Sequence, residues 1–255
     1  MSIDACAEIV RRGDPDRFLA TMTAPVAARE RLLPLYAFNV EVARAPWLTA
    51  EPMIAEMRLQ WWRDVLDEIA RGGPVRRHEV ATPLAQVLDP EGAILLDSLV
   101  AARRWDCTRA PFADQAAFEA HIDACFGTLM WVAARVLGAA TGERALRDLA
   151  FAQGIAAWLL AVPDLEARGR LPLVDGRPAA VAALARQGLA RLAAARRQRA
   201  AIPPAATPAA LTAWRAGAIL GRAAADPTRV AEGRLAPSEF HRRAGLLIRS
   251  LTGRW

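Results

Sequence analysis

Apolar residues recur at intervals of three and four along most of this chain, which is the spacing of one face of an α-helix. The pattern is clearest between Met53 and Ile69, where the apolar positions are Ile54, Met57, Trp61, Val65 and Ile69. Pro52 stands where a first helical turn favours proline, and two glycines follow at 72–73. The sequence therefore predicts a helix over 53–69 that is buried on one side.

Similar patterns predict further helices over 29–44, 82–104, 114–137, 144–162, 178–201, 208–224 and 237–251. In the last of these, the apolar residues Phe240, Ala244, Leu247 and Leu251 are expected to face inward. Pro34 is expected in the first turn of its helix or at a kink, and Pro163 is expected to end the helix that precedes it. No run alternates as a strand does. We therefore predict an all-α fold, with residues 1–255 forming one domain.

The composition narrows the class of protein. With 255 residues, of which 54% are hydrophobic, the chain can bury a large core. Its net charge is +6, and all 33 basic residues are arginine, a composition that indicates a GC-rich bacterial genome rather than a function. A basic protein still suits an anionic partner such as a membrane surface. Nothing beyond this charge indicates nucleic-acid recognition.

Cysteine usage and apolar segments bear on the compartment. Cys6, Cys107 and Cys125 are odd in number and far apart, so they predict neither a disulfide framework nor a zinc site. Residues 1–12 lack the basic-then-apolar order of a signal peptide. The most apolar stretch, 154–162, is shorter than the roughly 20 residues that a membrane-spanning helix needs. We therefore expect a cytoplasmic protein.

Three segments carry a family resemblance. They are RLLPLYAFNVEVA at 31–43, RLQWWRDVLDEI at 58–69, and AQGIAAW at 152–158 followed by RGRLPL at 168–173. Their order and spacing resemble the squalene/phytoene synthase family of head-to-head prenyltransferases, and the resemblance covers about residues 16–173. It implies a helical bundle of the isoprenoid synthase type.

The resemblance also implies a particular chemistry. In active members, Mg²⁺ ions bridge the substrate diphosphate to aspartates on two helices, because Mg²⁺ prefers octahedral oxygen coordination by carboxylates and phosphates. The metal stabilises the departing diphosphate while the allylic carbocation forms. Without those carboxylates the mechanism has nothing to ionise the substrate.

The first acidic motif of the family is missing here. Its acids follow the tyrosine of the Tyr-Ala-Phe segment by seven, eight and eleven residues, and counting from Tyr36 these positions hold Ala43, Arg44 and Trp47. Glu41 is the nearest carboxylate. Two residues along a helix rotate a side chain by about 200°, so Glu41 is expected to point away from the family's ligand positions.

The second acidic motif is reduced to one residue. Its first acid should follow the glutamine of the third segment by seven residues, and counting from Gln153 this position holds Leu160. Asp164 alone remains in the expected region. A single carboxylate is not a magnesium site, so we expect no catalytic residue, no metal ligand and no cofactor.

The segment 39–43, Asn-Val-Glu-Val-Ala, resembles the branch of the family whose eukaryotic members are mitochondrial complex I assembly factors. The leading interpretation is therefore a catalytically degenerate synthase-like protein that acts by binding. Its expected partner is a respiratory complex subunit or an assembly intermediate. The expected location is cytoplasmic, with peripheral contact to an anionic membrane at the inner face of the inner membrane.

Two alternatives stay open. One is an active, Mg²⁺-dependent prenyltransferase that condenses isoprenoid diphosphates into squalene, phytoene or a related product. The other is a metal-free isoprenoid or lipid carrier with an apolar cavity. The carrier's candidate lining residues, which are equally consistent with simple core packing, are Phe38, Val42, Trp131 and Trp158.

Six residues are the candidate ligand contacts of such a site: Tyr36, Phe38, Arg44, Asp164, Arg168 and Arg170. The pair Trp61 and Trp62 is expected to pack in the core, with one ring partly exposed. The basic helix over 178–201 has two interpretations, the outer helix of a bundle or an amphipathic helix on an anionic membrane. Its apolar stripe is Val181, Leu184, Gly188, Leu192 and Ala195.

Overall fold

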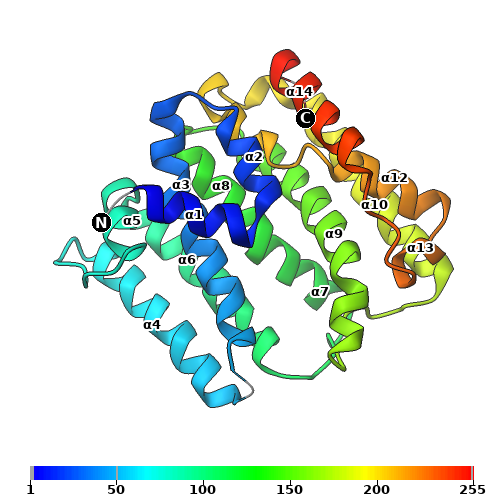
Figure 1. Ribbon diagram of the computed structural model, residues 1–255, viewed down its shortest axis with the longest axis horizontal. Helices are drawn as coiled ribbons and strands as arrows, with labels where there is room; N and C mark the ends of the chain where they lie inside the picture. The colour runs from blue at the N-terminus through cyan, green and yellow to red at the C-terminus, as the bar shows by residue number, and fades with distance from the viewer. Residues whose placement is uncertain (1–2, 50, 254) are drawn as a thin grey trace. The chain divides into compact units, whose positions relative to one another are not determined.

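The computed structural model describes residues 3–49, 51–253 and 255, and within these ranges it contains helices and no strand (Figure 1). The α-helices are α1 (Ile3–Gly13), α2 (Pro15–Met22), α3 (Val26–Arg44), α4 (Pro52–Ala70), α5 (Ala81–Val87), α6 (Pro90–Ala102), α7 (Gln115–Ile122), α8 (Thr128–Val136), α9 (Glu143–Ala167), α10 (Pro178–Arg197), α11 (Thr207–Leu211), α12 (Ala216–Ala225), α13 (Thr228–Ala231) and α14 (Glu239–Thr252). A π-helical turn, Asp123–Gly127, joins α7 to α8. The prediction of an all-α fold is confirmed.

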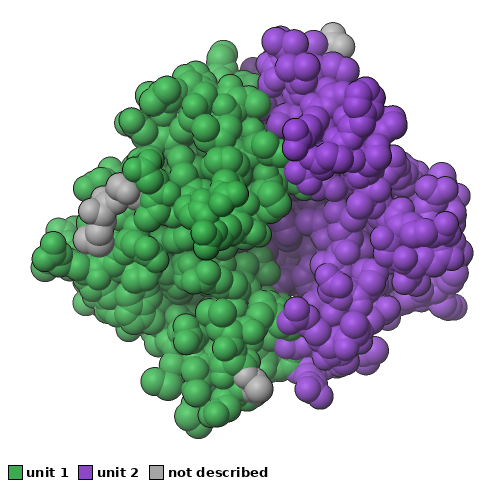
Figure 2. Space-filling model, viewed as in Figure 1, with its two compact units in different colours: residues 1–108, 128–140, 204–209 green, residues 109–127, 141–203, 210–255 purple. Residues whose placement is uncertain are grey.

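The chain divides into two compact units, which Figure 2 colours separately. Unit 1 comprises residues 1–108, 128–140 and 204–209, and unit 2 comprises residues 109–127, 141–203 and 210–255. In unit 1, α3 packs against α1, α2 and α5, and α4 packs against α6. Every residue of α3 from Leu32 to Val40 is buried, so this helix forms the core of its unit.

Unit 2 is organised around α9. This helix packs against α7, the π-helical turn, α10, α12 and α13. Gly154 allows a close approach to α7, because a Cβ atom at this position would lie 2.7 Å from Ile122 Cγ2. Among the described residues, α9 is the helix long and apolar enough to cross a bilayer, with a mean hydropathy of 1.4 over 18 residues. Since 72% of that window is buried inside the molecule, α9 has the character of a core helix.

Several predicted boundaries are wrong, and most errors involve proline. The predicted helix over 82–104 is interrupted at residues 88–89, because Pro90 starts α6 and Asp89 caps it through a 2.6 Å hydrogen bond from Gly92 N to Asp89 Oδ1. Pro34 lies inside α3, well after its first turn, so the expected first-turn position is wrong and the alternative, a kink, stays a prediction. Pro163 does not end α9, which continues to Ala167. The short helices α1, α2 and α13 were not predicted.

The buried faces of two helices also differ from the predictions. In α4 the buried residues are Ala55, Leu59, Trp62, Val65, Leu66 and Ile69, whereas the predicted positions Ile54 and Met57 are exposed. In α14 the predicted inward residues Phe240, Leu247 and Leu251 are all exposed, and Leu246 is buried instead. Helical periodicity identified both elements, but it did not identify the side that packs.

The stripe on α10 was predicted correctly. Val181, Gly188, Leu192 and Ala195 are buried, Leu184 is half-buried, and α10 packs against α9 and α12. A Cβ atom at Gly188 would lie 2.9 Å from Leu220 Cδ1, so glycine permits the close approach of α10 and α12. Because this apolar face is covered by protein, α10 is the outer helix of a bundle, and its four arginines are on the exposed side together with several alanines.

Candidate functional site

The positions expected to hold the first acidic motif lie at the end of α3 and in the 3₁₀ turn Ala45–Trp47 that follows. Ala43 and Trp47 are half-buried, and Arg44 is exposed. Arg44 Nη2 lies 2.8 Å from Glu41 Oε1, which makes an ion pair one turn along the same helix. The cationic Arg44 side chain therefore neutralises the carboxylate of Glu41.

The surroundings of Glu41 make it an unusual carboxylate. Burial raises the pKa of Glu41, while the positive charge of Arg44 and the nearby His78 act in the opposite direction. Two residues earlier, Asn39 is buried, and its Oδ1 atom has no hydrogen-bond partner among the described residues. The resemblance implies paired acids at this end of α3. The structure has instead the partly buried ion pair of Glu41 with Arg44 and the unsatisfied amide oxygen of Asn39.

Tyr36 and Phe38, two of the candidate ligand contacts, lie in the core of unit 1. The Arg17 guanidinium lies over the Tyr36 ring, 5.2 Å from its centroid. Burial raises the pKa of the Tyr36 hydroxyl well above its usual value. The Phe38 ring meets the Trp62 ring edge-on, with centroids 5.3 Å apart. On α3, then, the structure places Tyr36, Phe38 and Arg44 against three different partners rather than around one space.

The Trp61-Trp62-Arg63-Asp64 segment of α4 has an architectural role. Trp62 is 4% exposed and Trp61 is half-buried, which confirms the prediction of core packing with one ring partly exposed. Both rings pack against His78, with centroids 5.0 and 5.5 Å apart. Arg76 lies over Trp61, 5.3 Å from the ring centroid. The segment therefore fixes the chain that follows α4 onto α4 itself.

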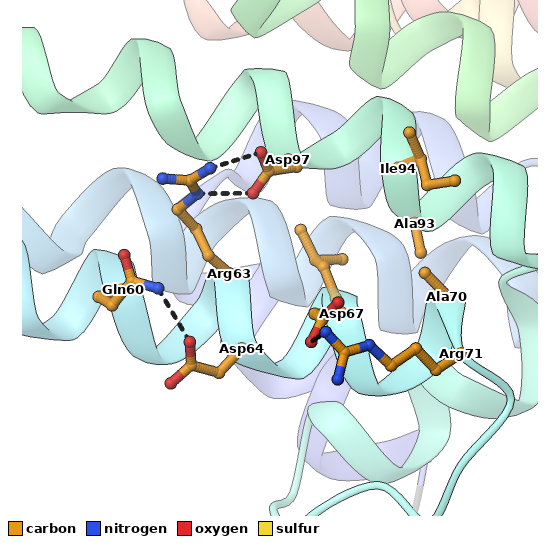
Figure 3. Close-up of a pocket in the computed structure, with 10 residues that line it drawn as sticks. Gln60, Arg63, Asp64, Asp67, Ala70, Arg71, Ala93, Ile94 and Asp97 are labelled. Carbon is orange, nitrogen blue, oxygen red and sulfur yellow. Dashed lines mark hydrogen bonds and ion pairs between the residues drawn. The ribbon is translucent and has the colours of Figure 1, made fainter.

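Arg63 continues this role across a surface groove between α4 and α6 (Figure 3). Its guanidinium donates two hydrogen bonds to Asp97 on α6, at 2.6 and 2.8 Å. The groove has a volume of about 420 Å³, and two other pairs line it, Gln60 with Asp64 and Arg71 with Asp67. The charged groups that line the groove are therefore paired with neighbouring polar or charged side chains.

The remnant of the second acidic motif lies at the end of α9 in unit 2. Leu160 is half-buried, whereas Asp164 and Glu166 are both exposed. Arg168-Gly169-Arg170 then terminates the helix as a Schellman motif, with hydrogen bonds from Arg170 N to Leu165 O and from Gly169 N to Glu166 O. Gly169 adopts a φ of 73°, a left-handed conformation that favours glycine. The Arg-Gly-Arg sequence is therefore a helix stop, with Arg168 exposed and Arg170 buried.

The lining residues proposed for a carrier cavity are core residues. Phe38, Val42, Trp131 and Trp158 are each less than 10% exposed. Trp158 Nε1 donates a 2.9 Å hydrogen bond to Pro172 O. The Trp158 ring also packs against Phe112, Phe118 and His121. This side chain holds the segment after α9 against the helix.

The residues at the family's metal positions do not fit Mg²⁺. Alanine, arginine, tryptophan and leucine supply no anionic oxygen. Across residues 3–49, 51–253 and 255, no group of three or more His, Cys, Asp or Glu side chains is arranged to hold a metal ion. We therefore derive no reaction step through a metal. The assignment of the six candidate ligand contacts stays a prediction.

Sequence reasoning missed the residues that organise this part of unit 1. His78, Arg76 and Asp97 lie outside the recognised segments, and their partners are 8 to 34 residues away or on other elements. No local spacing links such residues. For Asn39, a polar residue inside a buried apolar stretch was the available signal.

The helical fold and the motif segments together define a class, the synthases of the isoprenoid type and their relatives. The family model for squalene/phytoene synthase matches residues 10–174, which is more than half of the chain. The chain belongs to the squalene/phytoene synthase family.

Curated relatives that match the chain are named as complex I assembly factors. The Drosophila melanogaster homolog of NADH dehydrogenase (ubiquinone) complex I, assembly factor 6, is 30% identical over 178 residues, which cover 66% of this chain and 53% of the relative. The Bos taurus assembly factor 6 is 33% identical over 69 residues, which cover 27% of this chain and 21% of the relative. The chain thus spans about half the length of the Drosophila relative, and less of the bovine one.

Solved structures support the fold. A dehydrosqualene synthase in complex with a ligand aligns with a TM-score of 0.79 at 13% identity, covering 98% of this chain and 95% of that one. Squalene synthase HpnC from Alicyclobacillus acidocaldarius aligns with a TM-score of 0.72 at 16% identity, covering 87% of this chain and 92% of that one. These similarities establish the isoprenoid synthase fold and leave the activity to be argued from the site.

Proposed function

We propose that this chain is a catalytically degenerate member of its family that acts by binding, as an assembly factor for a respiratory membrane complex of the complex I type. The observation that carries the proposal is the residue set at the ligand positions: Ala43, Arg44, Trp47 and Leu160. These positions lie on or beside helices that the fold retains, so the scaffold persists without its acids.

The charge at the site supports a non-catalytic role. An active site of this family must gather cations around a diphosphate, and the cations must be held by protein carboxylates. Here the side chain at position 44 is itself a cation, and it is paired with Glu41. Asp164 and Glu166 are exposed to solvent at the other remnant. No metal cofactor is part of the proposal.

The relatives support the partner class. The curated proteins that match are named as complex I assembly factors, whereas the structural neighbours named as synthases share only 13% and 16% identity. We propose a complex I subunit or an assembly intermediate as the partner. We also propose a cytoplasmic location at the inner face of the inner membrane, with peripheral contact to anionic lipid.

A deletion and complementation experiment tests the proposal. In the organism that encodes this chain, deleting the gene should reduce the amount of assembled complex I on native gels and the NADH–quinone reductase activity of membranes. Re-expression of the chain should restore both, and the C30 and C40 isoprenoid hydrocarbons should not change. An active squalene synthase expressed in its place is the control and should restore neither.

The opposite pattern would replace the proposal with the prenyltransferase alternative. In that case complex I would remain normal in the deletion strain, and a C30 or C40 product would disappear. Rescue of that product by the control synthase would establish the alternative.

A further inference from the structure

The last helix, α14, turns its apolar side to the solvent. Phe240, Leu247, Ile248 and Leu251 are 77%, 59%, 60% and 78% exposed. The side that packs on unit 2 is largely polar or small: Arg242 and Arg249 are half-buried, and Gly245 lies near the Trp214 ring. Leu246 is the one buried apolar residue of the helix.

The two sides are opposite faces of the helix. At about 100° per residue, the apolar residues fall within one arc of roughly 100°. They are Phe240, Ala244, Leu247, Ile248 and Leu251. The centre of this arc lies opposite the packed residues Arg242, Gly245, Leu246 and Arg249. An apolar arc of this width normally faces a core. In α14 it faces away from the protein, and no polar side chain lies within the arc.

Basic residues border this arc. Arg243 is exposed beside it, in an ion pair with Glu239 at 2.8 Å. At the other end of the helix, Arg196 Nε donates a 2.9 Å hydrogen bond to Trp255 O, and Arg199 donates to Gly253 O. Burial lowers the pKa of Arg196, and the like charge of Arg249 lowers it further. The end of α10 thus places arginines next to the end of α14.

The surrounding sequence has a strong positive excess. Between Gly176 and Thr252 there are thirteen arginines and three acidic residues, and each of the three acids is paired with an arginine close to it in sequence. Between Gly176 and Ala225 there is no acidic residue at all. A positive potential of this extent attracts an anionic surface and opposes the approach of a second copy of the same face.

We propose that the outward face of α14 inserts into the headgroup region of an anionic lipid bilayer, with the neighbouring arginines next to lipid phosphates. An apolar arc with basic flanks is the arrangement by which amphipathic helices lie in a membrane interface. The inference moves the proposed membrane contact from α10, whose apolar face is covered, to α14. It deepens that contact and does not depend on the complex I role.

Vesicle flotation of the purified full-length chain tests this inference. Vesicles of phosphatidylglycerol and phosphatidylcholine should bind the chain, vesicles of phosphatidylcholine alone should bind it much less, and the binding should weaken as salt rises. The double variant Phe240→Ser/Leu251→Ser should lose at least tenfold in affinity. Arg199→Gln/Arg243→Gln should reduce the preference for anionic vesicles.

The matched control is Met53→Ser/Met57→Ser, which removes two exposed apolar side chains from α4 in unit 1. It should bind vesicles as the unchanged protein does. All variants alter exposed side chains, so we expect their melting temperatures to agree with that of the unchanged protein. This measurement is the control that the variants fold. Equal binding by the α14 variant would overturn the inference. The inference would also be overturned if the unchanged protein were a dimer in solution and Phe240→Ser/Leu251→Ser converted it to a monomer. In that case the apolar face of α14 would contact a second copy of the chain.

Discussion

Single residues distinguish this chain from the active members that it resembles. Ala43, Arg44, Trp47 and Leu160 stand where the resemblance implies acids, and the nearby Glu41 is bound to Arg44. The consequence is a change of charge as well as a loss of ligands, because position 44 now carries a fixed positive charge. A diphosphate that reached this residue would meet a cation without needing a metal.

Glu41 provides a pH-dependent test at this scale. Its pKa is raised from the ordinary value of 4.5, so the native state binds the proton more tightly than the unfolded state does. Stability contributed by this group therefore falls as the pH rises through that range. The variant Glu41→Gln should raise the melting temperature at pH 7, and the gain should shrink as the pH approaches 4.

Glu30→Gln is the matched control, because Glu30 is an exposed carboxylate on the same helix. It should change the free energy of unfolding by less than about 0.5 kcal/mol at either pH. If Glu41→Gln lowers the melting temperature at pH 7, the ion pair with Arg44 outweighs the cost of burying the charge, and our interpretation of this site is wrong.

At the scale of elements, close contact between helices depends on small residues. A Cβ atom at Gly154 of α9 would lie 2.7 Å from Ile122 Cγ2 and 2.9 Å from Phe126 Cδ2. Overpacking of this kind costs about 1–3 kcal/mol. The variant Gly154→Ala should therefore lower the melting temperature by several degrees in a thermal unfolding experiment.

Gly221 in α12 is the matched control, because a Cβ atom there would meet nothing within 4 Å. Gly221→Ala should stabilise the chain by about 0.5–1 kcal/mol, since alanine loses less backbone entropy in a helix. If both variants stabilise the protein equally, α9 and the 115–127 segment do not pack as closely as described.

The positions of the helices were easier to predict from the sequence than the face that each helix buries. Apolar spacing located α4, α10 and α14, but α4 carries apolar residues on two faces, and α14 carries its larger apolar face outward. A pattern that assumes the apolar side is buried fails where an apolar side faces the solvent. Pro163 shows a further limit, because tertiary packing around α9 holds a proline inside the helix.

For the whole molecule, the family and the fold could be predicted because the motif segments lie on helices with fixed spacing. Of the candidate site, the sequence predicted only that the family's acids are absent from positions 43, 44, 47 and 160. What stands near those positions, such as the contact of His78 with the two tryptophans and the pairing of Arg63 with Asp97, joins elements that are far apart in sequence. Such pairs follow from the fold and not from local pattern.

The central claim is that this chain does not use Mg²⁺ to bind and ionise an isoprenoid diphosphate. A ligand at 100 times its dissociation constant stabilises the native state by about 2.7 kcal/mol, which raises the melting temperature of a chain of this size by several degrees. Thermal unfolding with farnesyl or geranylgeranyl diphosphate, with and without Mg²⁺, therefore measures the claim directly. An active squalene synthase is the positive control.

We predict that adding Mg²⁺ to either diphosphate leaves the melting temperature unchanged, because positions 43, 44, 47 and 160 supply no carboxylate. A small shift that does not depend on metal agrees with this account, since the exposed guanidinium groups of Arg44 and Arg168 can donate hydrogen bonds to a diphosphate. A rise that requires Mg²⁺, disappears with a chelator and is accompanied by release of pyrophosphate would contradict it.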